Sequence, residues 1–132
     1  MQERLDAALN GPTVARLHNP KYSMIAYPFS ARYQNSNQWV LEFLAAAQTG
    51  GAVTRESVQE YLKDRGYIPD TVRIGAFKRF GASLFRANVQ SDDHPDTESE
   101  NSRYSFVSVR SILRYLEETG GMKSRSEIIS ND

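Results

Sequence analysis

The fold is decided by the stretch SNQWVLEFLAAA, which occupies residues 36–47. Its apolar side chains recur at helical spacing and form one wide face: Trp39, Val40, Phe43, Leu44 and Ala47. Few polar residues stand opposite this face, and a helix that is apolar nearly all round belongs inside a protein. The stretch therefore predicts a buried central helix that begins at Ser36 and ends at the turn of residues 49–51.

The flanking sequence predicts further helices and short strands. Apolar residues at helical spacing predict helices at residues 2–9, 55–65, 76–86 and 109–116. Aromatic and β-branched residues predict strands at residues 22–27, 68–74 and 104–107, whereas residues 14–18 fit either a helix or a strand. The polar, acidic residues 90–102 predict an exposed loop. Together these elements indicate one α+β domain at residues 1–120 and a flexible C-terminal tail at residues 121–132.

The composition excludes several classes of partner. Basic and acidic residues number 16 each, so no charge excess favours nucleic acid or an anionic membrane. Basic and aromatic residues do alternate between residues 77 and 86, but their helical spacing favours a core face over a nucleic-acid surface. The longest apolar stretch is about half the length needed to cross a bilayer, and Met1 is not followed by a secretory signal. The absence of cysteine excludes disulfides and cysteine-ligated metals.

The start of the central helix is a candidate site for chemistry. Unpaired backbone N–H groups and the positive end of the helix dipole stabilise negative charge there. Ser36 shares a helical face with Val40, Phe43 and Ala47, which predicts a side chain that points toward the packed body. Its neighbours Gln34, Asn35 and Asn37 are uncharged and could line an oxyanion or substrate-binding pocket. The alternative is that Asn35 or Ser36 merely caps the helix.

The residues around this helix carry a resemblance to a known family. The run YQNSNQWVL at residues 33–41 is preceded by Tyr22 and by Pro28-Phe29-Ser30, and is followed by the run DDHP at residues 92–95. With residues 104–116, this pattern resembles the bacterial family named domain of unknown function 2145. The resemblance extends from Tyr22 to Glu118.

The resemblance implies a fold and an activity. It implies a papain-like, permuted thiol hydrolase, in which the central helix packs on a small antiparallel sheet and a cysteine stands at position 36. Serine in its place is expected to silence a thiol enzyme, because a hydroxyl is almost never ionised at neutral pH. The family pattern also implies an upstream, histidine-bearing half, which this chain is expected to lack.

Two histidines are candidates for the general base. His18 stands near a turn and matches no family motif, whereas His94 is flanked by Asp93, which could orient the ring. The alternative reading of both is an ordinary histidine, His94 in a solvated acidic loop. The carboxylates around His94 do not have calcium-loop spacing, so we expect no metal. No cofactor is expected either.

Two functions remain open at this point. The first is a hydrolase of amide, peptide or thioester bonds with Ser36, His94 and Asp93 at the catalytic positions, inactive with serine at position 36. The second is a non-catalytic binding or assembly subunit that keeps the fold, with a partner chain supplying an upstream half. The expected partner is a protein or peptide. The resemblance is compatible with the bacterial cytoplasm or the periplasm, and the residues do not choose between them.

Overall fold

The computed structural model describes residues 2–50, 54–77, 87–124 and 126, and it has an α+β fold. Its helices are α1 (Gln2–Leu9), α2 (Thr13–Leu17), α3 (Ser36–Thr49), α4 (Arg55–Asp64), α5 (Ile74–Phe77), α7 (Asp96–Glu100) and α8 (Val109–Glu118). Its strands are β1 (Asp70–Arg73) and β2 (Arg103–Phe106). The predicted α+β class is therefore confirmed.

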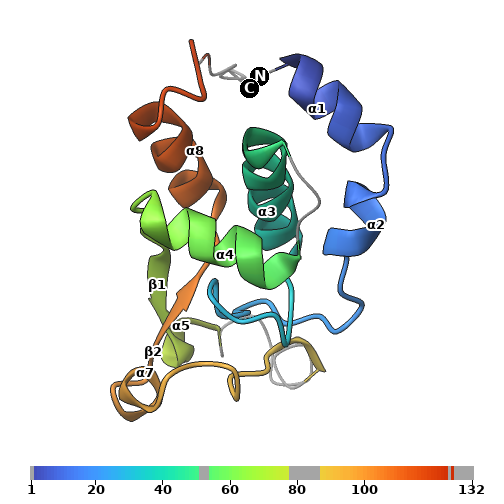
Figure 1. The fold of residues 1–132 in the computed structure, drawn as a ribbon. Coiled ribbons are helices and arrows are strands. Elements are labelled where there is room, and N and C mark those ends of the chain that lie inside the picture. The colour runs from blue at the N-terminus through green and yellow to red at the C-terminus, as the bar shows by residue number, and fades with distance from the viewer. Residues whose placement is uncertain (1, 51–53, 78–86, 125, 127–132) are drawn as a thin grey trace, which may run out of the picture.

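Helix α3 stands at the centre of the molecule, as its sequence predicts. In Figure 1, α1 and α2 lie on one side of it, α8 lies on the other, and α4 crosses in front. Asn35 caps its start, and Gly50 ends it with a φ of 65°, a left-handed conformation that glycine adopts without strain. These four helices are its main packing partners, so α3 does not lie on the sheet as predicted.

The buried face of α3 differs from the predicted one. Leu41 is 1% exposed and both Gln38 and Glu42 are fully buried, whereas Val40 is 40% exposed. Phe43 and Ala47 are buried as expected. The prediction counted only apolar residues, and it failed because two polar residues find hydrogen-bond partners inside the protein.

The polar partners of Glu42 explain its burial. Its carboxylate forms a bidentate pair with the guanidinium of Arg55 on α4, with N···O distances of 2.8 and 3.0 Å. The side-chain amides of Gln34 and Gln59 also donate to it, at 2.8 and 2.7 Å. Arg55 in turn donates to the carbonyls of Ala31 and Tyr33. This polar network joins α3, α4 and the chain that leads into α3.

Helices α4 and α8 begin as their sequences indicate. Thr54 and Ser108 each accept a hydrogen bond from the backbone N–H three residues on. The side chain of the serine at that position in turn accepts a hydrogen bond from the backbone N–H of the cap residue. The sheet is small: β1 and β2 pair antiparallel, with Asp70 opposite Phe106 and Arg73 opposite Arg103. The strand predicted at residues 68–74 is therefore present in shortened form, and the strand predicted at residues 104–107 is present one residue earlier.

Two other expectations need correction, and one choice left open is settled. Residues 22–27 form no strand beyond one bridge from Tyr22 to Gln34, because the N–H groups of Met24 and Tyr27 bond to the loop around residues 88–93 instead. Residues 14–18, left open, lie largely in α2. Residues 90–102 are not simply an exposed loop, because they contain α7 and a buried His94.

Some of the predicted elements lie outside the residues that the structure describes. Most of the predicted helix at residues 76–86, with its basic residues, lies outside the described part of the chain, and so does most of the tail at residues 121–132. Within the described ranges, every helix is too short or too polar to span a bilayer.

Candidate functional site

The start of α3 is held by hydrogen bonds from nearly every side chain around it. We call residues 35–38 the α3 head. Asn35 accepts a hydrogen bond from the backbone N–H of Gln38 at 2.7 Å and donates to the carbonyl of Met24 at 3.2 Å. Asn37 donates to the carbonyl of Val107 at 3.3 Å. The side chain of Gln38 donates to the carbonyl of Tyr27 at 3.2 Å.

The side chains predicted to line an oxyanion pocket thus form hydrogen bonds with other parts of the protein. Asn35 is the helix cap, which was the alternative considered for it, and Asn37 anchors the end of β2. Gln34 is buried, and its side-chain amide donates to the carbonyl of Leu17 and to Glu42 at 2.8 Å each. Its side-chain oxygen accepts from the backbone N–H of Asn19. The three side chains give the α3 head its shape and do not face a vacant pocket.

Ser36 differs from its neighbours because its side chain is free. It is exposed, and it forms no hydrogen bond with any described residue. The prediction of an inward-pointing side chain is wrong, because Ser36 shares the outer side of α3 with the half-exposed Val40. The backbone N–H groups of Ser36 and Asn37 also lack a hydrogen-bond acceptor among the described residues. Donors at the positive end of a 14-residue helix are therefore open at this position.

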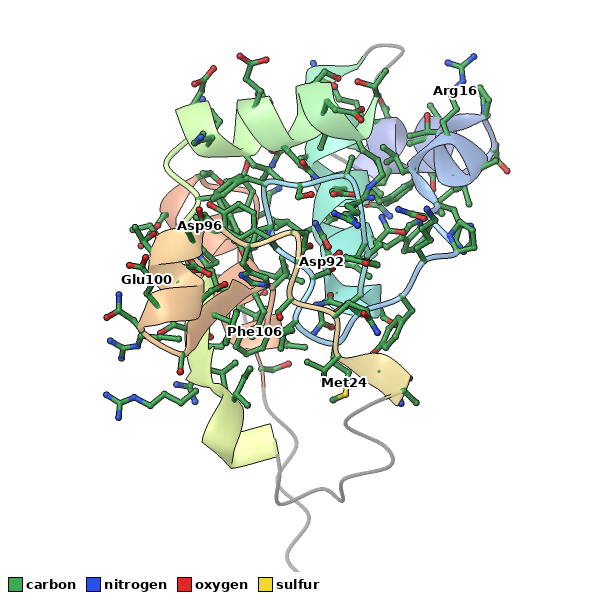
Figure 2. The ribbon with its side chains drawn as sticks, turned by 90° about the horizontal axis from the view of Figure 1, so that it is seen from below. Arg16, Met24, Asp92, Asp96, Glu100 and Phe106 are labelled. Atoms are coloured by element: carbon green, nitrogen blue, oxygen red, sulfur yellow. The ribbon has the colours of Figure 1, made fainter. Side chains whose placement is uncertain are left out.

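His94 lies in the loop that leads to α7. Figure 2 shows this end of the molecule from below, with Asp92 on that loop, Asp96 and Glu100 on α7, and Met24 at the same end. The ring is buried. Its Nδ1 lies 2.7 Å from Oε2 of Glu98, and its Nε2 lies 2.5 Å from the carbonyl oxygen of Ile25. Both ring nitrogens are therefore engaged.

Two carboxylates flank this ring and have shifted pKa values in opposite directions. Burial alone would raise the pKa of Glu98, but hydrogen bonds from the side chain and backbone of Ser105 and from His94 outweigh it and lower that pKa. Burial dominates at Asp93 and raises its pKa, although the N–H of Tyr27 and the nearby His94 oppose this. One Asp93 oxygen is buried without a hydrogen bond, 3.5 Å from Nε2 of His94.

This geometry does not assemble the predicted catalytic set. Asp93 does lie beside His94, as predicted, but neither group forms a hydrogen bond with Ser36. His18 is exposed and lines a shallow pocket with Arg16, Asn19 and Thr54, away from the α3 head. No group of three or more potential metal ligands gathers among the residues that the structure describes.

Comparison with known families decides the membership of the chain. The model of domain of unknown function 2145, described as an uncharacterized protein conserved in bacteria, matches residues 1–116. The chain belongs to this family. The match includes α1 and α2, which precede the residues that suggested the resemblance, and it ends within α8. Comparisons with curated proteins and with solved structures gave no match.

Sequence reasoning missed the importance of Glu98 and Ser105. Glu98 lies on α7, four residues after His94, which precedes the extended Pro95 at the start of that helix. Ser105 lies across from α7 on β2 and donates to both Glu98 oxygens, at 2.9 and 2.6 Å. Neither contact follows from helical spacing, because the first depends on how the chain enters α7 at Pro95 and the second on how β2 packs beside α7.

The hydrogen bonds of the α3 head predict how two substitutions change the free energy of unfolding. Asn35→Ala removes the cap and the bond to Met24, so we expect a loss of about 1–3 kcal/mol in the free energy of unfolding. Ser36→Ala is the matched control on the adjacent residue, and we expect a change within about 0.5 kcal/mol because its side chain has no partner. Denaturant unfolding of both variants measures this. Equal losses would show that Ser36 also supports the fold.

Proposed function

We propose that this chain is a non-catalytic binding domain whose ligand site is the α3 head, with Ser36 at its centre. The observation that carries the proposal is the contrast within the run of residues 34–38. Four of these side chains hold the local structure, whereas Ser36 is exposed and unbonded. A side chain kept free in so tightly built a segment is available for a ligand.

The chemistry of the α3 head indicates the class of ligand. The N–H groups of Ser36 and Asn37 and the hydroxyl of Ser36 are donors, and the helix dipole adds positive potential. Such a set favours a carbonyl or carboxylate oxygen of a protein or peptide. Both nitrogens of His94 are engaged, so this imidazole is not available to draw a proton from Ser36. Binding without turnover is therefore the function that the geometry supports best.

Binding is tested by NMR titration of the ¹⁵N-labelled full chain with two short probes, N-acetyl-alanine and N-acetyl-alanine amide. We expect saturable shifts of the Ser36 and Asn37 amide signals, with the carboxylate probe binding more tightly. Ser36→Glu should abolish the shifts, because it places a competing carboxylate at the same N–H groups. Glu60→Gln, an exposed change on α4, is the control. Shifts spread evenly over the surface would overturn the proposal.

A papain-like thiol hydrolase is the second candidate, and one observation favours it. Residue 36 is the first residue of a long helix and is exposed, which is where a thiolate would be stabilised and accessible. With cysteine at position 36, a nearby base from a partner chain or a further segment would complete the site. The thiol would then attack an acyl carbon while the helix N–H groups stabilise the oxyanion.

This second candidate predicts an unusually reactive thiol. Ser36→Cys should react with iodoacetamide near neutral pH about 3- to 10-fold faster than Glu60→Cys, because a helix dipole stabilises charge by about 0.5–1.4 kcal/mol. Glu60 is exposed in the middle of α4 and makes a suitable reference. The pH dependence of both rates measures the two thiol pKa values. Equal rates would remove the support for a hydrolase site.

A further inference from the structure

One short segment connects the α3 head to the loop that carries His94. We call residues 23–27 the bridge segment. On one side, its Met24 and Tyr27 carbonyls accept hydrogen bonds from Asn35 and Gln38 of the α3 head. On the other side, the N–H of Met24 donates to Asn88, and the N–H of Tyr27 donates to Asp93 at 2.8 Å. The position of the α3 head thus depends on this segment.

His94 binds the middle of the bridge segment through the carbonyl of Ile25. A carbonyl oxygen can only accept, so Nε2 must carry a proton. The other nitrogen, Nδ1, faces Oε2 of Glu98, which already accepts from the N–H of Ser105. An ionised carboxylate also only accepts, so Nδ1 must carry a proton too. The arrangement therefore fits a doubly protonated, positively charged ring.

The groups around the ring support a positive charge. Glu98 faces it from α7 and Asp93 from its own loop. The ring of Tyr27 lies 5.2 Å from it on the bridge segment, and the ring of Tyr104 lies 5.0 Å from it on β2. Burial first, and then the charges of Glu98 and Asp93, raise the pKa of Tyr27, so that phenol stays neutral. Two carboxylates thus face one buried imidazole.

We infer that His94 is a proton-dependent latch that holds the bridge segment and thereby positions the α3 head. When the ring loses a proton, the remaining proton stays with the charged Glu98, which is the stronger acceptor. The bare Nε2 then faces the Ile25 carbonyl and an Asp93 oxygen, and these groups repel it. The bond to the bridge segment breaks, and the segment that supports Asn35 and Gln38 loosens.

The latch has an acid and an alkaline limit. The pKa of Glu98 is lowered, so its contribution to the folded state is complete above its ordinary pKa and is lost only as the pH falls through the lowered value. The pKa of Asp93 is raised. Its contribution to the stability of the folded state is therefore complete below its ordinary pKa and is lost as the pH rises through the raised value. The loss of one proton from the His94 ring is the alkaline limit. The latch is closed between these limits.

The wild-type chain tests the latch by NMR. Two-bond ¹H–¹⁵N spectra of the His94 ring report whether each nitrogen carries a proton. We expect both to be protonated at the acid end of the titration, and the loss of one proton to coincide with shifts of the Met24 and Tyr27 amide signals. Their hydrogen exchange should then rise roughly tenfold beyond the intrinsic pH effect, equivalent to one bond to a charged group. A singly protonated ring at every pH would overturn the inference.

Variants separate a latch from a merely structural histidine. Glu98→Gln removes the charge that favours the second proton, so the bridge segment should loosen at a lower pH than in the wild type. His94→Gln can still donate to Ile25 but does not titrate, so it should keep the segment closed at all these pH values. His18→Gln is the control and should behave as the wild type. An unchanged pH of loosening in Glu98→Gln would contradict the inference.

The consequence for ligand binding rests on the proposed function. N-acetyl-alanine should bind more weakly to the wild type above the pH at which the bridge segment loosens, and its affinity for His94→Gln should stay constant. Failure of the two ideas is distinguishable. If no probe binds but the ring and the bridge segment titrate together, the latch stands and the binding site does not. If the probe binds with the same pH dependence to wild type and His94→Gln, the latch is overturned.

Discussion

Arg55→Met is expected to lower the free energy of unfolding by about 3–5 kcal/mol, because it leaves the carboxylate of Glu42 buried without its counter-ion. Glu42 is fully buried, and Arg55 meets it with two hydrogen bonds of 2.8 and 3.0 Å. The same change removes the donors to the Ala31 and Tyr33 carbonyls. Methionine keeps much of the aliphatic volume, so the loss would arise from charge and hydrogen bonding.

The matched control is the ion pair of Arg32 with Asp92. These groups lie 2.7 Å apart, but both side chains are more than half exposed. Arg32→Met should therefore cost about 0–1 kcal/mol. Chemical denaturation of the two variants compares the same substitution in a buried and an exposed pair.

A double variant tests the cause of the Arg55 effect. Removing both charges in Glu42→Met/Arg55→Met should cost less than the sum of the single changes, because neither charge is left unpaired. Gln34 and Gln59 each keep a second acceptor, the carbonyls of Leu17 and Ser30. Strictly additive losses would mean that the buried charge itself is not what destabilises the single variants.

This network also shows what the sequence could and could not predict. Helix boundaries follow local rules, so the start of α4 after Thr54 and the extent of α3 were predicted well. The orientation of α3 depends instead on Glu42, whose partners Arg55 and Gln59 come 13 and 17 residues later. A residue that is charged in the sequence is taken for a surface residue unless its partner is known. The predicted face therefore included Val40, which is exposed, and missed the buried Gln38 and Glu42.

The bridge segment illustrates a second limit. Its aromatic and β-branched residues predict a strand, but a strand needs a neighbour for its backbone groups. The structure gives these groups to Asn88, to the side chain of Asp93 and to the side chains of the α3 head. Since these partners lie far away in the sequence or belong to side chains, local propensity did not reveal them.

Some features of the candidate site follow from local sequence signals, and others depend on tertiary contacts. Position 36 at the start of a helix was predicted from local signals, and so was the alternative that Asn35 is the cap. That Ser36 points outward, and that His94 is locked between Glu98 and Ile25, depends on tertiary contacts. The contacts of His94 favour the proposed binding function over the hydrolase hypothesis, because they occupy both nitrogens of the expected base.

Leu41→Ala is expected to cost about 2–5 kcal/mol in the free energy of unfolding, since it creates a cavity on the buried face of α3. Leu41 is 1% exposed within the core formed by α3, α4 and α8. Val40→Ala, one residue earlier on the same helix, is the matched control. Its side chain is 40% exposed and alanine has the higher helix propensity, so we expect a change of no more than about 0.5 kcal/mol.

The pair of variants distinguishes the two orientations of α3. The face predicted from apolar spacing includes Val40, so it predicts a large loss for Val40→Ala as well. The structure predicts that Leu41→Ala is the more damaging change, by at least about 2 kcal/mol. Thermal or denaturant unfolding of both proteins settles the order. If Val40→Ala were the less stable variant, α3 would be rotated, Ser36 would turn inward with Val40, and the exposed position on which the binding proposal depends would be lost.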